Sequence, residues 1–445
     1  MRLFRRKLYD ELLQWKQKWN GRYAVLIEGA RRVGKSTLVK QFAQNEYDSF
    51  ILIDFSAAPQ HVIDLFDNVA DLNNFFLSLQ VYYDTKLVVS KSVIIFDEVQ
   101  LCPKARQAIK HLVADGRYDY IETGSLISIH KNVVNIVIPS EEKKLTLHPM
   151  DFEEFMWAIN KSVSIDILKE MIANKMRIDE GSTRQMMHHL RMYMMIGGMP
   201  QAVDALVESN DLEYVDSVKR SIIELYEEDF HKIDPAGRLS MLFDAIPAEL
   251  NRNSSRYQVT SVIGNTTADN TIAELIAELS ESKTINLAYH ANDPGVGMSL
   301  FRDISRYKMF TADTGLFVTL SFKDKQFTDN IIYKKLLSDK LEANLGYIYE
   351  NLVAQMLVAK GHKLFYYTFP TESGKHNYEV DFITQSGNKI NPIEVKSSGY
   401  ARHASLDAFC EKYSSRVANR YVVYTKPPMK RLQTTYIPMF LIPFL

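Results

Sequence analysis

The chain has 445 residues, of which 46% are hydrophobic and 24% are charged, and its formal net charge at pH 7 is −1. This length excludes a fold with one hydrophobic core, so two to four domains are expected, and the composition is typical of a soluble globular protein. Because the net charge is close to zero, it argues neither for nor against nucleic-acid binding, and any basic surface must be local.

The cysteines and the apolar segments predict a cytoplasmic protein without a membrane partner. Cys102 and Cys410 lie far apart and match no zinc or redox spacing, which is typical of a reduced compartment. No apolar run reaches the ~18 residues that a membrane-spanning helix needs. The basic N-terminus is not followed by an apolar segment of signal-peptide length.

The first predicted element is an amphipathic helix near the N-terminus. Its apolar residues recur at helical spacing, namely Phe4, Leu8, Leu12, Trp15 and Trp19. We expect this helix to pack on the core of the first domain. A helix on a membrane surface is the alternative, which two early acidic residues and the lack of a second anchor make weaker.

A phosphate-binding motif follows this helix. Residues 29–36 read Gly-Ala-Arg-Arg-Val-Gly-Lys-Ser, which fits the pattern G-x-x-x-x-G-K-[ST] of a P-loop. An apolar run at 24–27 precedes the motif as a buried strand would, and the helix-compatible segment 37–43 follows it. A strand, a glycine loop and a helix N-terminus present backbone N–H groups and a positive dipole end to a polyphosphate. This context makes a chance match on a Gly/Ser turn the weaker interpretation.

The motif predicts individual roles in binding ATP and Mg²⁺. The residues expected to contact the nucleotide are Gly29, Arg32, Val33, Gly34, Lys35, Ser36 and Thr37. Lys35 is expected to reach the β- and γ-phosphates and to act in catalysis, and Ser36 is expected to offer its hydroxyl to Mg²⁺.

The next strong signal is an apolar strand that ends in two carboxylates, Ser-Val-Ile-Ile-Phe-Asp-Glu at 92–98. Such a strand is expected to be buried on both faces of a parallel sheet covered by helices. We predict that Asp97 holds Mg²⁺ together with Ser36, and that Glu98 orients or deprotonates the attacking water. A solvent-facing acidic strand end is the alternative, which the P-loop makes weaker.

A third strand is predicted at 120–125, and it also ends in small polar residues. Either Thr123 or Ser125 can contact the γ-phosphate or the attacking water as a sensor, and Ser125 is the candidate catalytic residue. Alternating strands and helices continue to about residue 150, which predicts a mostly parallel sheet.

Beyond residue 150 the pattern becomes helical to about 235, and a small winged-helix-like module is predicted at 236–325. The segments 259–264 and 270–279 would be its second and third helices, and 285–289 would begin the wing. Such a module can read DNA with its third helix, but here that helix carries glutamates that would repel phosphate. A protein-docking or inter-domain role is therefore the preferred interpretation.

The C-terminal region carries acidic residues around a predicted hairpin. The dipeptide Gly387-Asn388 suits a two-residue hairpin loop, and pairing outward from it places Asp381 opposite Glu394. Lys396, two residues further along the strand, shares the same face. Pro392 is expected to disturb this register with a bulge.

Two close carboxylates repel each other unless a proton or a cation lies between them. A hard divalent ion such as Mg²⁺ would suit Asp381 and Glu394, which we predict as a second metal site, with Lys396 stabilising charge on a phosphate or hydroxide. An ion-paired strand face in a fold without cleavage activity is the alternative.

The layout of these residues resembles the PD-(D/E)xK core of restriction-endonuclease-like nucleases, with Val380 in place of the proline. Glu350 falls where such folds often supply a further acid. The whole chain resembles a family of prokaryotic AAA-type ATPases with such a C-terminal domain. The resembling segments are residues 29–37, 96–98, 123–125, 147–155, 197–200, 308–316 and 394–396. The resemblance implies an AAA-like ATPase, a winged-helix linker and a nuclease-like end, but no substrate.

The predicted fold class is α/β, with a P-loop parallel sheet, a helical lid, a winged-helix-like module and a C-terminal α/β nuclease-like domain. The predicted domain boundaries are 1–150, 151–235, 236–325 and 335–445. The predicted function is an ATP-hydrolysing AAA-type ATPase coupled to nucleic-acid binding or metal-dependent cleavage. An ATP-gated protein-interaction switch with an inert nuclease-like domain is the alternative.

ATP and Mg²⁺ are the expected cofactors. DNA, RNA, a protein partner and a homo-oligomer all stay open as partners. The candidates for an arginine that acts on the phosphates in trans are Arg31, Arg32, Arg117 and Arg220, and the sequence does not discriminate between them.

Overall fold

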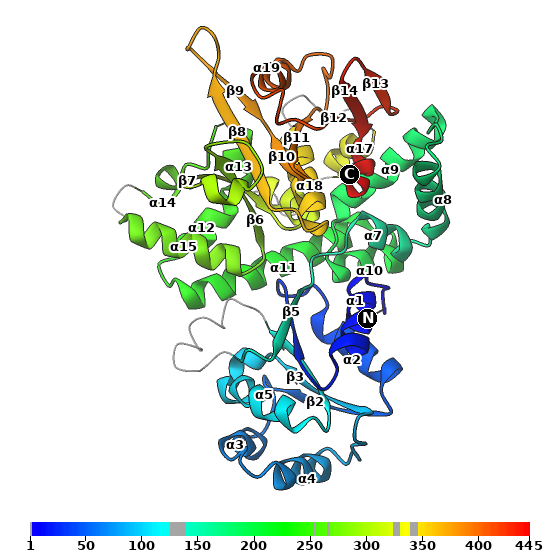
Figure 1. Ribbon diagram of the computed structural model, residues 1–445, viewed down its shortest axis with the longest axis vertical. Coiled ribbons are helices and arrows are strands. Elements are labelled where there is room, and N and C mark those ends of the chain that lie inside the picture. The colour runs from blue at the N-terminus through cyan, green and yellow to red at the C-terminus, as the bar shows by residue number, and fades with distance from the viewer. Residues whose placement is uncertain (1, 125–138, 253, 265–267, 324–329, 339–345) are drawn as a thin grey trace. The chain divides into compact units, whose positions relative to one another are not determined.

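The computed structural model describes residues 2–124, 139–252, 254–264, 268–323, 330–338 and 346–445 (Figure 1). Their contacts group into two compact units. One is Met1–His148 with Glu281–Lys283, and the other is Pro149–Ser280 with Thr284–Leu445. Within the described ranges, no helix is long and apolar enough to cross a membrane.

The first unit contains a five-stranded parallel sheet in the order β2-β3-β4-β1-β5. Its strands are β1 (Ala24–Glu28), β2 (Ser49–Asp54), β3 (Ser92–Asp97), β4 (Asp119–Gly124) and β5 (Glu142–Thr146). Its helices are α1 (Leu8–Trp19), α2 (Lys35–Glu46), α3 (Gln60–Asp64), η1 (Leu65–Asp67), α4 (Leu72–Tyr82), η2 (Val99–Leu101) and α5 (Pro103–Asp115). The predicted α/β fold with a parallel central sheet is confirmed.

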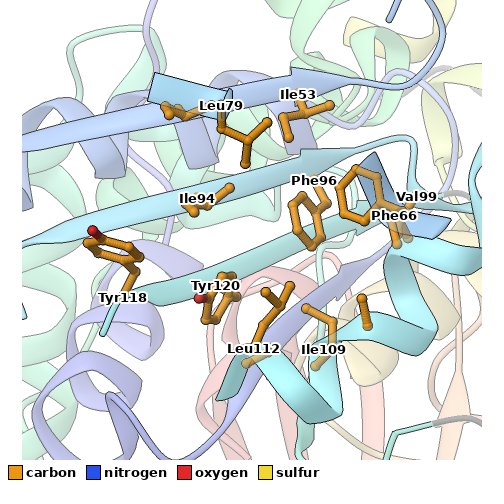
Figure 2. Close-up of a cluster of buried hydrophobic side chains, with 14 of the residues drawn as sticks. Ile53, Phe66, Leu79, Ile94, Phe96, Val99, Ile109, Leu112, Tyr118 and Tyr120 are labelled. Atoms are coloured by element: carbon orange, nitrogen blue, oxygen red, sulfur yellow. The ribbon is translucent and has the colours of Figure 1, made fainter. Parts of the chain in front are cut away.

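The core on one face of this sheet combines alternate strand residues with residues of the covering helices (Figure 2). Ile94 and Phe96, two residues apart on β3, point to the same face because side chains alternate along a strand. There they join Tyr120 of β4 and the α5 residues Ile109 and Leu112. Every residue of β3 is buried, which explains why its central residues 93–96 are all apolar.

The N-terminal helix α1 packs on the first unit as predicted. Leu8, Leu12 and Trp15 are buried, and α1 contacts α2. The indole nitrogen of Trp15 donates to the carbonyl oxygen of Tyr23 at 3.0 Å. Trp19, the last member of the predicted stripe, is 37% exposed because it lies at the helix end.

The second unit begins with helices, as the sequence pattern predicts for residues 151–235. They are α7 (Phe152–Ala158), α8 (Ser162–Ala173), α9 (Glu180–Ile196), α10 (Pro200–Ser209) and α11 (Leu212–Ile233). Further helices are α12 (Arg238–Asp244), α13 (Ile246–Asn251), α14 (Val259–Ile263), α15 (Asp269–Glu281), η3 (Met298–Phe301), α16 (Thr314–Ser321), α17 (Asn330–Leu337), α18 (Gly346–Ala359), α19 (Ala404–Lys412) and η5 (Met439–Phe444).

The strands of the second unit form two mixed sheets. One has the order β7-β6-β8-β9 and the other the order β10-β11-β12-β14-β13. The strands are β6 (Ile285–Ala291), β7 (Arg302–Thr311), β8 (Leu364–Pro370), β9 (Asn377–Val380), β10 (Phe382–Ser386), β11 (Lys389–Val395), β12 (Arg420–Tyr424), β13 (Met429–Arg431) and β14 (Thr434–Pro438). Because β6 pairs with β8, one sheet contains strands from both sides of the predicted gap between 325 and 335. The four-domain division stays a prediction.

The predicted winged-helix module has matching elements in the structure. Helices α14 and α15 cover the two predicted helical segments, and β6 pairs antiparallel with β7 as a wing would. However, β6 also pairs with β8, so the hairpin belongs to a larger sheet. The winged-helix interpretation therefore stays a prediction.

The C-terminal hairpin has the predicted register, with Phe382 opposite Ile393 and Ser386 opposite Lys389. The predicted bulge at Pro392 is wrong, because Ile383 pairs with Pro392 in an unbroken ladder. The ladder between β11 and β12 begins only at Ile393, so the missing N–H of the proline falls outside that ladder.

Candidate functional site

The P-loop lies between β1 and α2, and two of its residues have left-handed backbone conformations. Arg32 and Gly34 have positive φ angles of 69° and 95°. Left-handed residues of this kind can direct successive backbone N–H groups towards one point, which forms an anion-binding site. A side chain at Gly29 is excluded, because a Cβ there would lie 2.3 Å from the carbonyl oxygen of Leu147. The two glycines of the motif therefore serve different needs, a close backbone approach at one and a left-handed turn at the other.

The ammonium of Lys35 is held inside the loop. Its Nζ donates to the carbonyl oxygens of Gly29 at 2.9 Å and Ala30 at 3.0 Å. The side chain is buried, and burial lowers the pKa of Lys35, against the opposing effect of the Glu98 and Asp97 carboxylates. The cation is thus already in place beside the backbone donors of the loop.

Three of the predicted elements meet at Asp97. The hydroxyl of Ser36 donates to Oδ1 of Asp97 at 2.9 Å, and the hydroxyl of Thr123 donates to the same oxygen. These residues come from the start of α2, the end of β3 and the end of β4. A hydroxyl and a carboxylate in contact are oxygen ligands of the kind Mg²⁺ binds, with water completing its shell. The residues present therefore fit the predicted ion.

Glu98 follows directly on the strand and is half-buried. Its backbone is left-handed, with φ of 53°, and its carboxylate accepts a hydrogen bond from Nε2 of Gln100. Gln100 was not predicted, because a glutamine three residues after a strand carries no recognisable signal on its own.

Arg6 is a second residue that sequence reasoning missed. Its guanidinium donates to the carbonyl oxygens of Val33 at 2.8 Å and His148 at 2.6 Å, and its side chain is buried. It therefore ties the N-terminal segment to the phosphate-binding loop. Its distance of 27 residues from Val33 leaves no local pattern that could have revealed it.

The remaining predicted residues are placed as follows. Val33 is buried, Thr37 is half-buried and Arg32 is exposed. Among the candidate trans-acting arginines, Arg117 is paired with Asp115 and Arg220 with Asp216. Ser125 lies outside the described residues.

The second candidate site is a cavity of about 680 Å³ in the second unit. Its charged lining residues are Glu350, Glu379, Asp381, Glu394 and Lys396. The structure thus brings together the four residues predicted for this region, from α18, β11 and the segments that flank β10 and β11.

The carboxylates of this acidic pocket differ in their partners. Oδ2 of Asp381 accepts a hydrogen bond from the backbone N–H of Val395 at 2.7 Å. Oε1 of Glu394 lies 2.7 Å from Nζ of Lys396, whereas Oε2 of Glu394 is buried with no hydrogen-bond partner. A buried charged oxygen without a partner is unfavourable, so this position favours a cation.

A further lining residue, Glu379, and the lysine that pairs with it were not predicted. Nζ of Lys308, on β7, forms an ion pair with Oε1 of Glu379 and lies 4.0 Å from Oε2 of Glu350. Glu379 stands two residues before Asp381, so strand alternation was a usable signal for it. Lys308 is 71 residues from Glu379 in the chain, and no spacing rule connects them.

The pocket has an excess of negative charge. Burial raises the pKa of Asp381 well above its usual range, and the Glu350 and Glu394 carboxylates raise it further. Burial also raises the pKa of Glu350. The pKa of Lys396 is raised because nearby carboxylates, Glu394 first, outweigh the lowering effect of burial.

Across the described part of the chain, no group of three or more His, Cys, Asp or Glu side chains is arranged to hold a metal ion. Asp381 and Glu394 together would offer only two carboxylates to an ion. This number is sufficient for Mg²⁺, which is commonly held by one or two carboxylates with several waters. The unpartnered Glu394 oxygen fits such an ion.

Three family models match separate parts of the chain. Residues 21–156 match an AAA domain, residues 187–326 match a domain of unknown function (DUF8612), and residues 345–442 match another (DUF4143). The first match covers the P-loop, Asp97 and Glu98, and it supports an AAA-type P-loop domain in the N-terminal part. The two other matches do not identify a winged helix or a nuclease.

No curated protein matches the sequence. Solved structures with some likeness include the Walker-type ATPase PABY2304 of Pyrococcus abyssi, at 15% identity and a TM-score of 0.41, covering 72% of this chain and 96% of that one. The Aeropyrum pernix ORC1 protein in complex with DNA has 11% identity and a TM-score of 0.28, covering 76% and 93%. The Thermotoga maritima RuvB branch migration motor has 14% identity and a TM-score of 0.28, covering 63% and 89%. Scores this low do not establish a function for this chain.

Proposed function

We propose that the chain binds ATP with Mg²⁺ at residues 29–37 and Asp97, and hydrolyses it with the help of Glu98. The observation that carries this proposal is the hydrogen-bonded group of Ser36, Asp97 and Thr123 beside a loop with left-handed residues at Arg32 and Gly34. The match of residues 21–156 to an AAA domain supports it.

In this proposal, the backbone N–H groups of the loop and the ammonium of Lys35 bind the phosphate oxygens. Lys35 exchanges its two loop carbonyl partners for phosphate. Ser36 and Asp97 hold the metal ion, which when bound neutralises charge on the β- and γ-phosphates. Thr123 keeps the Asp97 carboxylate oriented through its hydroxyl.

Glu98 has the role of positioning water and accepting its proton. Its half-buried carboxylate is held by Gln100, which limits the directions in which it can accept a proton. A base held in a fixed position next to the γ-phosphate lowers the entropic cost of reaching a reactive geometry.

Asp97 and Asp54 lie at the same edge of the sheet, and only Asp97 is a proposed metal ligand. Asp97→Asn removes a metal ligand, so ATP turnover should fall strongly while Mg²⁺-free nucleotide binding persists. Asp54 stands directly opposite Asp97 on β2, and Asp54→Asn should leave turnover unchanged. Equal turnover in both variants, measured by phosphate release, would remove the assignment.

For the acidic pocket, we propose a divalent-cation site that acts on phosphodiesters of DNA or RNA. The buried, unpartnered Oε2 of Glu394 in a cavity lined by carboxylates and by Lys396 supports this. Lys396 would stabilise charge on a phosphate oxygen or hydroxide. The rival proposal is an inert pocket in an ATP-gated protein-interaction switch. The carboxylates of the pocket favour this rival as long as no cation is bound, because they repel a phosphate group.

The two proposals differ in how the full chain responds to Mn²⁺. The full chain is needed because β8 pairs with β6, so a fragment beginning near residue 335 would lose a strand partner. If Asp381 and Glu394 bind the ion, Mn²⁺ raises the melting temperature of the wild type but not of Glu394→Ala. An unchanged melting temperature in the wild type would favour the inert pocket.

A further inference from the structure

We propose that Lys308 is a built-in cation of the acidic pocket, which takes the place of a second metal ion and leaves room for a single divalent cation at Asp381 and Glu394. This inference rests on the proposed divalent-cation site, and it adds a positioning residue that lies outside the nuclease-like region.

Lys308 is placed among the carboxylates by the fold of a neighbouring hairpin. It stands on β7 opposite Ala288 of β6, and β6 in turn pairs with β8. Its side chain is only 8% exposed, so its ammonium cannot turn out to solvent. The ring of Tyr366 lies 5.5 Å from Nζ, and such a ring face adds a further favourable contact for the cation.

The contacts of Lys308 divide the four carboxylates into two pairs. Glu379 forms an ion pair with Nζ, and Glu350 lies 4.0 Å from it. These two acids therefore already share one protein cation. Asp381 and Glu394 make no such ion pair with Lys308, and Oε2 of Glu394 has no hydrogen-bond partner.

Charge balance gives the number of ions that the pocket can take. A bound divalent cation favours the ionised form of the acids around it. Four ionised carboxylates and the two ammonium groups of Lys308 and Lys396 together carry two negative charges. One divalent cation cancels them. Without the Lys308 ammonium three negative charges would remain, so a single divalent cation would leave one carboxylate charge uncompensated. An uncompensated buried charge is strongly unfavourable.

Removal of the Lys308 ammonium should therefore create a second ion site at Glu350 and Glu379. The test counts Mn²⁺ ions bound to the full chain by electron paramagnetic resonance, without nucleotide and in an Asp97→Asn background that silences the P-loop. With Lys308 intact, one ion should bind. Lys308→Met, which keeps most of the length of the side chain without its charge, should bind two.

Two further variants serve as controls. Lys363→Met changes an exposed lysine just before β8 and should still bind one ion. Lys308→Met combined with Glu379→Gln removes both members of the ion pair, so the count should return to one. If Lys308 only stabilised the fold, its replacement would not raise the number of bound ions. The number of ions therefore distinguishes a positioning role of Lys308 from a role in folding.

The outcomes distinguish this inference from the proposal on which it rests. If Asp381→Asn does not abolish Mn²⁺ binding in the chain with Lys308 intact, the proposed divalent-cation site fails. If that site stands but Lys308→Met still binds one ion, only the role of Lys308 is overturned. If two ions bind to the chain with Lys308 intact, the role of Lys308 is overturned as well. This measurement does not depend on whether a Lys308 variant folds.

A melting curve provides a second measurement. Mn²⁺ should raise the melting temperature of Lys308→Met by more than that of the same chain with Lys308 intact, because the ion replaces the missing ammonium. Equal shifts in the two proteins would contradict the inference.

Discussion

Lys35 is a buried cation whose partners in the structure are two carbonyl oxygens of its own loop. A phosphate oxygen would be a stronger partner for the ammonium, because hydrogen bonds between charged groups contribute about 1.5–3 kcal/mol. Lys35→Ala should therefore weaken ATP binding by about 10- to 100-fold, measured by calorimetry. Lys40→Ala, an exposed lysine on the same helix, should bind ATP as the wild type does. Undiminished affinity in Lys35→Ala would contradict the P-loop assignment.

Glu98 separates nucleotide binding from chemistry. Glu98→Gln keeps the shape of the side chain but removes the base, so ATP should bind normally while turnover falls by ~10²-fold or more. Gln100→Ala removes the donor that holds this carboxylate and should reduce turnover less, since the base itself remains. Single-turnover phosphate release measures both. Unchanged turnover in Glu98→Gln would mean that the water is positioned by another group.

At the scale of secondary structure elements, α1 is expected to stabilise the first unit rather than to act on a membrane. Leu12 is fully buried on the face of α1 that packs on the domain. Leu12→Ala should lower the free energy of unfolding of this unit by about 2–5 kcal/mol. Leu3→Ala, at an exposed leucine before the helix, should change it by less than about 0.5 kcal/mol. Urea titration followed by Trp fluorescence measures both.

Helices α9, α11, α16 and α17 meet at the buried ammonium of Lys219. Its Nζ donates to the carbonyl oxygens of Met195 at 2.8 Å and Gly315 at 3.3 Å, and to the hydroxyl of Tyr333 at 3.1 Å. Burial lowers the pKa of Lys219 to about 8, against about 10.4 for an unfolded lysine.

This lowered pKa predicts a pH dependence of stability in a definite direction. Between about pH 8 and pH 10 the unfolded chain binds more protons at Lys219 than the folded chain, so the free energy of unfolding should rise with pH. Lys219→Met should remove this contribution, and Asp216 would still be partnered by Arg220 and Thr319. Urea titrations at pH 8 and pH 10 measure the difference between the two proteins. An equal change with pH in both would contradict the prediction.

At the scale of the whole molecule, the open question is whether ATP turnover is coupled to nucleic acid or to a protein partner. If the chain contacts 6–10 phosphates, its affinity for DNA or RNA should fall by about 10³- to 10⁵-fold between 50 and 200 mM salt. An apolar protein interface would show no such fall. Fluorescence anisotropy over a salt series, together with ATP turnover with and without nucleic acid, decides between the two. Turnover and binding that ignore nucleic acid at low salt would favour the protein-interaction switch.

The sequence by itself determined the features that depend on residues close together in the chain. The P-loop, the carboxylates after β3 and the register of the C-terminal hairpin each follow from a spacing of a few residues. The backbone at Gly34, the alternation of side chains on β3 and the turn at Gly387 impose these arrangements locally. For this reason the predicted AAA-type domain and the juxtaposition of Asp381 with Glu394 could be argued without coordinates.

Only the tertiary structure decided which distant residues join these sites. Lys308 reaches Glu379 because β7, β6, β8 and β9 lie side by side in one sheet, and Arg6 reaches Val33 because α1 packs on α2. Such contacts arise from the packing of elements, and many pairs of charged residues at similar separations never meet. The pairing of β6 with β8, across the predicted gap between two domains, has the same cause. Strand pairing depends on burial in the whole unit and not on closeness in the sequence.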